Sequence, residues 1–345
     1  MPGTDAAAQL FPMLITGVAG VVGYNALDYF SRKHPGQVIG TRRVDNWRLQ
    51  GDAIRALNAY DADGMKRLFD EHEFASVLNC EGTCKLKSCE YDPDNARRIN
   101  VDSVNGLLAA APPATRIVTL SIDLVYSGTG DGDHREEDPT DPVTVYGETM
   151  VAAEQMFACE RPDACIMRIS LPMGVSFNGH AGAIDWIGSR FKKSLPATLY
   201  YDEVRTPTYT DCLNRTFEAV LASDLSGLYH AGAPRRLSMY EIGQVINRLG
   251  GYEADCLQGR PRHEAAPIPP RAGNVTLGSG KLRRALGYES FDPWPLREEH
   301  VPTHHEWHRE RPADEPGSAT YLSQVLARNP GRRPDVKPGS SPEQG

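Results

Sequence analysis

Three glycines near the start of the chain have a spacing that suits phosphate binding. They stand in the segment Thr16-Gly17-Val18-Ala19-Gly20-Val21-Val22-Gly23, directly after the apolar run Met13–Thr16. Glycines at this spacing permit a tight turn and let backbone N–H groups approach a pyrophosphate, whose charge is favoured at the N-terminus of a following helix. The segment Gly17–Gly23 therefore predicts a site for a dinucleotide cofactor.

Two arginines follow the next apolar run, at 37–41, where the end of a strand would meet the adenosine ribose. The adjacent guanidiniums of Arg42 and Arg43 suit a bidentate grip on the 2′-phosphate of NADP(H). Asp45 stands two residues further on, and an acidic residue in this region instead accepts from the ribose hydroxyl of NAD(H). We predict NADP(H) as the preferred cofactor and keep NAD(H) as the alternative.

The first half of the chain alternates short apolar runs with amphipathic stretches, which is typical of βαβ units. Strands are expected at 13–16, 37–41, 76–80, 116–121 and 165–169, and helices at 21–30, 94–111 and 145–158. Later helices are expected at 183–193, at 211–222 and after Ser238, with Glu241 completing a capping box, and a short strand at 227–230. The sequence predicts an α/β fold, a Rossmann-type doubly wound parallel sheet with a smaller α/β substrate lobe at its C-terminal side.

Composition divides the chain into four parts. Residues 1–12 are predicted to be disordered, 13–170 to form the cofactor-binding domain, and 171–297 to form a substrate-binding lobe interleaved with that domain. From 298 to 345, prolines, charges and a Gly/Ser-rich end predict a mostly disordered tail with one short helix near 318–329.

Charge and apolar content exclude several classes of partner. The net charge of −8 argues against nucleic acid and anionic membranes. No apolar run approaches the roughly 20 residues that span a bilayer, and the first residues lack the features of a secretory signal, so we expect a cytoplasmic protein. The seven cysteines show neither a disulfide framework nor zinc-site spacing. We expect no bound metal, and interpret the histidines at 300, 304, 305 and 308 as part of a solvated linker.

An ordered series of further motifs carries a resemblance to a known family. The motifs are Arg98-Ile99-Asn100-Val101, Asp123–Gly128, Arg135–Asp138, Tyr146-Gly147-Glu148-Thr149-Met150, Arg205–Thr208, Gly227–His230 and Arg271–Leu277. Over roughly 13–297 the chain resembles an extended short-chain dehydrogenase/reductase, similar to dTDP-4-dehydrorhamnose reductase and to the regulatory β subunit of methionine adenosyltransferase. The resemblance implies an NAD(P)-dependent reductase of a sugar nucleotide or related small polar metabolite. It also places Asp61 near the adenine amine, and Cys80 is counted among the cofactor-binding residues.

The catalytic positions that the resemblance implies are only partly filled. In this family a tyrosine donates a proton, a lysine four residues later lowers its pKa, and a serine or threonine binds the carbonyl oxygen. Tyr146 fits the first role and would also contact the cofactor. Met150 occupies the lysine position, and Ile122 the hydroxyl position, with Ser121 beside it. Losing such an acid–base system typically costs about 10²–10⁴-fold in rate.

Other residues are candidates to complete the site. Glu81 follows the strand at 76–80, where the family usually has a small residue beside the cofactor, and its carboxylate could serve as a base. Asp123 matches a residue common in the reductase subgroup and is a second catalytic candidate, with a structural role as the alternative. Arg205 matches an arginine that often contacts substrate phosphate, and joins Ser121 and Ile122 as a predicted substrate contact; an ordinary ion pair is the alternative.

Three functional hypotheses remain open at this point. The first is an NADP(H)-dependent oxidoreductase with the non-standard set Ile122, Tyr146 and Met150. The second is a catalytically weak, NADP-binding regulatory or scaffold subunit, and the third is lyase or epimerase chemistry on the same fold. Dimers through a two-helix face are common in this superfamily, so the helices at 94–111 and 145–158 are candidate homodimer surfaces.

Overall fold

A seven-stranded parallel sheet forms the centre of the computed structural model, which describes residues 10–179, 182–312, 314–315 and 317–328. The strand order is β11-β6-β5-β4-β1-β2-β3. In chain order the strands are β1 Met13–Thr16, β2 Val38–Arg42, β3 Ile54–Ala56, β4 Ser76–Asn79, β5 Arg116–Ile122, β6 Cys165–Ile169 and β11 Gly227–Ala231. The predicted doubly wound α/β fold is confirmed, and β3 is an additional edge strand that its short, mixed sequence did not indicate.

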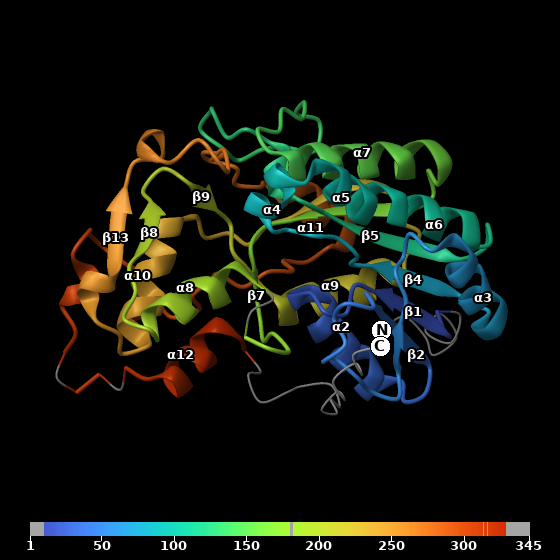
Figure 1. Cartoon of the computed structure of the whole chain (residues 1–345), viewed down its shortest axis with the longest axis horizontal. Coiled ribbons are helices and arrows are strands. Elements are labelled where there is room, and N and C mark those ends of the chain that lie inside the picture. Colours follow the sequence, from blue (N-terminus) through green and yellow to red (C-terminus); the bar gives the residue numbers. More distant parts are fainter. Residues whose placement is uncertain (1–9, 180–181, 313, 316, 329–345) are drawn as a thin grey trace.

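Helices cover both faces of the sheet (Figure 1). On one face lie α3 Ala62–His72, α4 Leu86–Tyr91, α5 Pro93–Arg97, α6 Ser103–Ala110 and α7 Val145–Glu160. On the other face lie α2 Val21–Lys33 and α9 Thr210–Leu221, which contact each other. The sheet is apolar on both sides, as a parallel sheet between helices must be, because each face is removed from water.

The carboxyl ends of the central strands bring distant segments together at one edge of the sheet. Thr16 at the end of β1 is paired with Asn79 at the end of β4, and the Thr16 hydroxyl donates to the Asn79 side chain at 2.5 Å. The residues that follow, Gly17 and Cys80, therefore leave the sheet side by side. Because the chain crosses to opposite sides of β1 at this point, a crevice for a ligand is expected here.

The smaller lobe is built from three two-stranded sheets and two helices. The sheets pair β8 Ala197–Tyr200 with β13 Leu257–Arg260, β7 Pro172–Met173 with β10 Thr208–Tyr209, and β9 Val204–Arg205 with β12 Leu237–Ser238. The helices are α8 Ala183–Phe191 and α10 Met239–Leu249, and α11 Gly280–Leu286 contacts β11. Between them α9 and β11 return to the main sheet, so the two units are interleaved. The predicted capping box of α10 is present, with Glu241 and Ser238 bonded reciprocally.

The helix expected at 94–111 is divided into three consecutive pieces. α5 starts at Pro93 with Asp92 as its N-cap, a π-helical turn spans Arg98–Asp102, and α6 continues from Ser103. π-helical turns inside helices are rare and often occur at functional sites. Hydrophobic periodicity alone does not reveal such a turn, because one extra residue shifts the pattern without interrupting it.

The prediction of a disordered tail from residue 298 is wrong for the part of it that the structure describes. Trp307 is buried, with the Arg248 guanidinium 4.1 Å from the centre of its ring, and the Tyr240 hydroxyl donates to the carbonyl of His305. Ser318 caps α12 Ala319–Leu326, whose Leu322 is also buried. Isolated apolar side chains anchor this segment although its average composition is polar. The predictions for residues 1–9 and 329–345 lie outside the described residues.

Candidate functional site

The glycine turn between β1 and α2 has the geometry that a pyrophosphate requires. Gly17 has a φ of +66°, in the left-handed region that favours glycine. A Cβ on Gly17 would lie 2.3 Å from the carbonyl oxygen of Cys80, and one on Gly23 would lie 2.6 Å from that of Gly17. Gly20 is the N-cap of α2 and no side chain caps the helix, so its first N–H groups remain available. These residues fit a bound pyrophosphate.

The other residues of the turn contribute through their backbone. Val18, Val21 and Val22 are buried and pack into the core, while Ala19 is partly exposed. The N–H of Val18 donates to the carbonyl of Thr41 at 3.0 Å, which ties the turn to the end of β2. Apolar packing of the valines against the core therefore fixes the turn, and the side that faces away from the core consists mainly of backbone atoms.

The two arginines at the end of β2 do not form the predicted pair of phosphate ligands. Arg42 is buried, and its guanidinium donates to the carbonyl oxygens of Leu49 at 2.5 Å and Arg43 at 3.1 Å. Arg42 therefore holds its own loop, and its predicted cofactor contact is corrected for that reason. Arg43 is partly exposed and forms a bidentate pair with Asp45, at 2.7 Å for the shorter contact. Only Arg43 remains as a candidate for the 2′-phosphate.

Asp61 and Cys80 flank the same crevice. The Asp61 carboxylate accepts from the N–H of Gly64 at 3.0 Å and caps α3, while the side chain stays exposed. Its contact with adenine stays a prediction. Cys80 lies against Gly17 through its carbonyl, and its N–H donates to the Thr16 hydroxyl at 3.1 Å. Burial raises the pKa of the Cys80 thiol far above its usual value, so the thiol stays protonated.

Glu81 lies directly over the glycine turn. A Cβ on Gly17 would lie 2.8 Å from the Cα of Glu81, and the Glu81 Oε2 atom is buried with no hydrogen-bond partner. Burial raises the pKa of this carboxyl to about 7, while the Arg43 guanidinium lowers it and Asp45 raises it. Glu81 thus belongs with the glycine turn and Arg43. Its role as a catalytic base stays a prediction.

This position of Glu81 predicts a pH-dependent affinity for the cofactor. We expect binding of NADH to weaken by about tenfold as pH rises from about 6 to about 8, because Glu81 loses its proton and then repels the pyrophosphate. In Glu81→Gln the affinity should stay near its low-pH value. NADH is the probe for calorimetry because a 2′-phosphate would itself titrate near pH 6. An equally steep pH dependence in Glu81→Gln would contradict the assignment of this effect to the Glu81 carboxyl.

The raised pKa of the Glu81 carboxyl also predicts how the free energy of unfolding changes with pH. Between the usual carboxyl pKa and about 7, the folded protein keeps a proton on Glu81 that the unfolded chain has released. The folded state therefore binds more protons, and the free energy of unfolding falls as pH rises through this window. Glu81→Gln should reduce that slope in urea denaturation at matched pH values.

Tyr146 is fixed at the first turn of α7. The Thr144 hydroxyl caps the helix by accepting from the N–H of Gly147 at 3.0 Å, and Glu90 accepts from the N–H of Val145 at 2.9 Å. A Cβ on Gly147 would lie 2.3 Å from the carbonyl of Leu124, so the helix starts in close contact with the segment that follows β5. This contact sets Tyr146 at the carboxyl edge of the sheet.

Asn100 connects the loop that follows β4 to α7. The sequence alone does not identify it as a site residue. It is buried in the π-helical turn, where its side-chain oxygen accepts from the N–H of Thr83 at 2.7 Å. Its amide donates to the hydroxyl of Thr149 at 2.8 Å, and Thr149 bonds in turn to the carbonyl of Tyr146. The available signal was an asparagine inside an apolar helical stretch, since a buried amide needs several partners.

The described neighbours of Tyr146 are mainly apolar. Tyr146, Met150 and Val125 share one buried apolar cluster, against which Ile122 packs. Burial raises the pKa of Tyr146 well above its usual value, and interactions with Cys84, Asp123 and Cys89 raise it further. Ile122 and Met150, the two departures from the family pattern, therefore pack in the same apolar cluster as Tyr146, the predicted proton donor.

Arg205 and Asp123 are bonded to each other and to further buried groups. The Arg205 guanidinium is 4% exposed, lies 2.9 Å from Glu203 and lies 3.7 Å from Asp123. Asp123 also accepts from the Ser170 hydroxyl at 2.6 Å, and burial raises the pKa of its carboxyl although Arg205 lowers it. Arg205 thus forms the ion pair that was the alternative interpretation of this residue, and its substrate contact stays a prediction. A catalytic role for Asp123 stays a prediction, beside this structural one.

Ser121 belongs to a separate buried network, which corrects its predicted role as a substrate contact. Its hydroxyl donates to the Glu154 carboxylate, which also accepts from Arg168 at 2.6 Å. Arg168 donates in turn to the Tyr126 hydroxyl at 2.6 Å. Ile122 points to the opposite side, as neighbouring strand residues do, and packs beside Tyr146. Its substrate contact stays a prediction.

Two expectations of absence concern the described residues only. Within them no group of three or more His, Cys, Asp or Glu side chains could hold a metal ion, and the seven cysteines are free. His300 and His308 are buried, and their rings lie 2.8 Å from the Tyr321 hydroxyl and 3.2 Å from the Gln244 amide. None of the described helices is long and apolar enough to cross a membrane.

The fold and the glycine turn define an extended short-chain dehydrogenase/reductase. Residues 12–300 match the family of the RmlD substrate binding domain, and the chain belongs to this family. It is 26% identical over 209 residues to a probable low-salt glycan biosynthesis reductase, Agl14, of Haloferax volcanii, covering 59% of this chain and 69% of that protein. It is 23% identical to the methionine adenosyltransferase 2 subunit beta of Xenopus laevis, covering 79% of this chain and 81% of that protein.

A solved structure shows the same fold. The dTDP-4-dehydrorhamnose reductase of Bacillus anthracis, crystallised in complex with NADP, superposes with a TM-score of 0.70 and 18% identity, covering 82% of this chain and 95% of that one. The family is thus one of NAD(P)-dependent, sugar-nucleotide reductases. The resemblance seen in the sequence motifs is confirmed at the level of family and fold.

Proposed function

We propose that this protein is an NADP(H)-dependent reductase of a nucleotide sugar or a related small polar metabolite, with Tyr146 as its proton donor. The observation that carries the proposal is the position of Tyr146 in the first turn of α7, at the sheet edge from which the glycine turn emerges. Membership of a reductase family and the pyrophosphate-binding geometry support it. NADP(H) is favoured by Arg43, and NAD(H) remains the alternative because Asp45 already neutralises that guanidinium.

The state of Tyr146 suggests a direction for the reaction. A bound nicotinamide cofactor would supply hydride to a carbonyl carbon, and the carbonyl oxygen would need a proton. Burial keeps the Tyr146 phenol protonated at neutral pH, so it can donate but cannot act as a base. Reduction of a carbonyl is therefore favoured over oxidation of an alcohol. With Ile122 and Met150 in the remaining positions, Tyr146 works without a second donor and without a neighbouring cation.

Single-turnover kinetics test this proposal. Enzyme saturated with NADPH is mixed with each of a panel of 4-keto nucleotide sugars, and cofactor oxidation is followed by absorbance. We expect slow turnover by the natural chain with at least one substrate, and a rate about 10²-fold lower in Tyr146→Phe, which lacks only the hydroxyl. Equal rates in the two proteins would remove Tyr146 from the mechanism.

A second candidate function is a cofactor-binding regulatory subunit. The apolar surroundings of Tyr146, Met150 and Ile122 favour it, and so does the similarity to a methionine adenosyltransferase subunit. This candidate predicts tight NADPH binding without turnover of any substrate in the panel. It also predicts a stable complex with a partner protein, to be compared for the full chain and a chain ending at residue 328. The cut falls there because an earlier one would remove the buried Trp307 and α12.

A further inference from the structure

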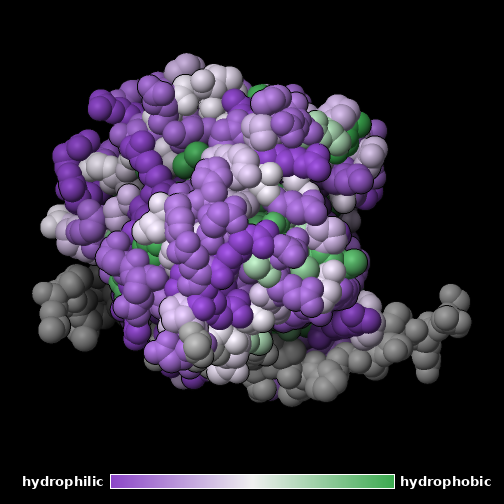
Figure 2. Space-filling model, turned by 90° about the vertical axis from the view of Figure 1, so that its left-hand side faces the viewer, coloured by the Kyte–Doolittle hydropathy of each residue, from purple (hydrophilic) through white to green (hydrophobic). Residues whose placement is uncertain are grey.

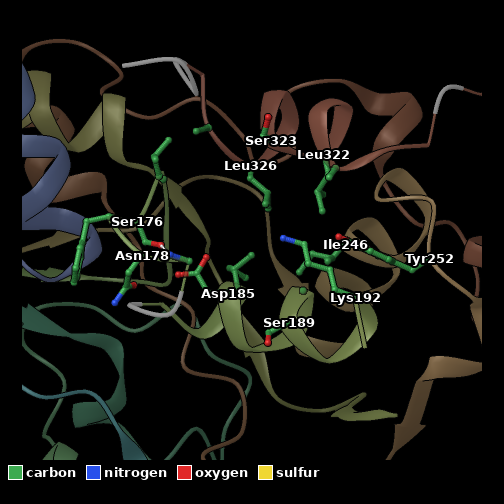
Figure 3. Close-up of a pocket in the computed structure, with 18 of the residues that line it drawn as sticks. Ser176, Asn178, Asp185, Ser189, Lys192, Ile246, Tyr252, Leu322, Ser323 and Leu326 are labelled. Carbon is green, nitrogen blue, oxygen red and sulfur yellow. Dashed lines mark hydrogen bonds between the residues drawn. The ribbon is translucent and has the colours of Figure 1, made fainter. Parts of the chain in front are cut away.

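A pocket extends from the loop at 174–179 to the C-terminal part of the described chain. At one end it approaches α2, because the Asn25 amide, which also bonds to the carbonyl of Val21, donates to the carbonyl of the lining residue Val175 at 2.7 Å. The pocket has a volume of about 750 Å³ and is enclosed by the loop at 174–179, α8, the end of α10 and the C-terminal helix α12 (Figure 3). None of the predicted catalytic or cofactor-binding residues lines it. Its size is typical of sites for small organic ligands. One wall of this pocket, α12, lies beyond the residues 12–300 that match the family.

The pocket is apolar at its centre, and the exposed Lys192 supplies a positive charge at the rim of one end. Ile184, Ile246, Leu322 and Leu326 supply aliphatic surface, and Lys192 stands with Tyr252 at the same end of the pocket (Figure 3). Among the described residues, neither Lys192 nor the adjacent Lys193 forms a hydrogen bond or ion pair that would neutralise its charge.

Two polar groups at the pocket complete its chemistry. The Tyr252 hydroxyl oxygen is buried and has no hydrogen-bond partner among the described residues. A buried hydroxyl without a partner is costly, so a ligand acceptor beside it would be stabilising. Asp185 also lines the pocket, but its carboxylate accepts from the N–H of Gly182 at 3.0 Å and caps α8. Asp185 keeps its negative charge, but in Figure 3 it lies toward Ser176 and Asn178, whereas Lys192 lies at the end with Tyr252.

Gly188 keeps the pocket open from the side of α8. It is a helical residue, and a Cβ placed on it would meet nothing within 4 Å. A Cβ on each of Gly23, Gly64, Gly106, Gly147 and Gly243, which lie in other described helices, would come within 2.6 Å of another atom. At Gly280, the first residue of α11, the nearest atom would be on the Arg284 side chain at 3.3 Å. Glycine inside a helix costs about 1 kcal/mol relative to alanine. Gly188 thus has no steric reason to be glycine, and the absence of a side chain widens the pocket.

We infer that this pocket binds an amphipathic carboxylate, a ligand with an apolar body and one carboxylate. The aliphatic side chains of α10 and α12 would cover the body, and Lys192 with the Tyr252 hydroxyl would bind the carboxylate through charge-assisted hydrogen bonds. A small ligand fits better than a protein partner, because the aliphatic side chains line a pocket of about 750 Å³ and not a flat surface. The side of the molecule drawn in Figure 2 is largely hydrophilic, with scattered apolar residues. The ligand would link α8 to α12.

Calorimetric titration of the full chain with decanoate tests the inference, with decanol as the neutral probe and decyl phosphate as the alternative anion. We expect decanoate to bind at one site, at least about tenfold more tightly than decanol. Gly188→Met, whose Cβ would meet no atom within 4 Å and whose longer side chain would occupy pocket volume, should abolish binding, whereas Gly188→Ala should leave it within about threefold. Lys192→Met should weaken binding at least about fivefold, and Lys192→Arg should retain it.

Each opposite result has a definite meaning. No binding of decanoate, or equal binding by Gly188→Met, would overturn the site. Equal affinity for decanol would overturn the role of Lys192, and much tighter binding of decyl phosphate would overturn the carboxylate in favour of a phosphate ligand. The titration is repeated with saturating NADPH, so that failure of this site is seen separately from failure of cofactor binding.

Discussion

Replacing Met150 by lysine should raise carbonyl reduction at neutral pH by about 10²-fold. Residue 150 is four positions after Tyr146 on α7, so both side chains lie on one face of the helix. An ammonium there would oppose the burial that now raises the pKa of Tyr146, and a nearby opposite charge shifts a pKa by roughly 1–3 units. A more acidic phenol donates its proton faster, which is the origin of the expected gain.

The measurement for Met150→Lys is the single-turnover rate with NADPH over a range of pH. The rate profile should shift to lower pH as well as rise, since the pKa of Tyr146 falls. Met150→Leu is the matched control, because it keeps the volume and the neutral character of the buried side chain. If burial of the ammonium unfolds the protein, Ile122→Thr tests the missing carbonyl donor instead, with a gain of about 10-fold or more expected. Rates equal to those of the Leu variant would contradict this account.

Replacing Gly17 by valine should weaken cofactor binding by more than about 10²-fold. A Cβ at this position would lie 2.3 Å from the carbonyl of Cys80 and 2.8 Å from the Cα of Glu81, and both are backbone atoms that cannot turn aside. The φ of +66° adds strain for any β-branched residue. The turn must therefore open, and the N–H groups of α2 lose the arrangement that fits a pyrophosphate.

Gly36→Val is the control for Gly17→Val. Gly36 also has a positive φ, +75°, but a Cβ there would meet nothing within 4 Å, and the residue lies away from the turn. Both variants should lose stability through backbone strain, whereas only Gly17→Val should lose the rise in melting temperature that saturating NADH gives. A full rise in Gly17→Val would mean that the cofactor does not bind at this turn.

The sheet and the glycine turn were predictable because each rests on a local pattern. Short apolar runs, such as the one that ends at Thr16, can only be buried strands between helices, and the glycine spacing specifies a close turn. The departures at Ile122 and Met150 were also predictable, since counting along one strand and one helix suffices. The structure adds that these two side chains pack in a single cluster with Tyr146.

The errors arose where partners from distant segments decide a side chain's role. Arg42 looked like a free phosphate ligand, but carbonyls of the 43–49 loop hold its guanidinium. For Arg205 the sequence left an ion pair open, and the structure supplies its partners, Glu203 and Asp123. Ser121 was misplaced because its partner, Glu154, lies on α7. The described part of the tail was misjudged because a few apolar contacts, such as that of Trp307 with Arg248, outweigh a polar average composition. Sequence spacing contains no information on such pairings.

Calorimetric titration of the natural chain with NADPH and with NADH tests the central claim most directly. The account predicts one cofactor per chain, tighter binding of NADPH than of NADH, and loss of that preference in Arg43→Ala, which removes the remaining guanidinium beside Asp45. Binding that favours NADH would transfer the proposal to NAD(H) and make Asp45 the ribose ligand. Failure of both cofactors to bind would contradict the dinucleotide site itself, and with it the proposed reductase.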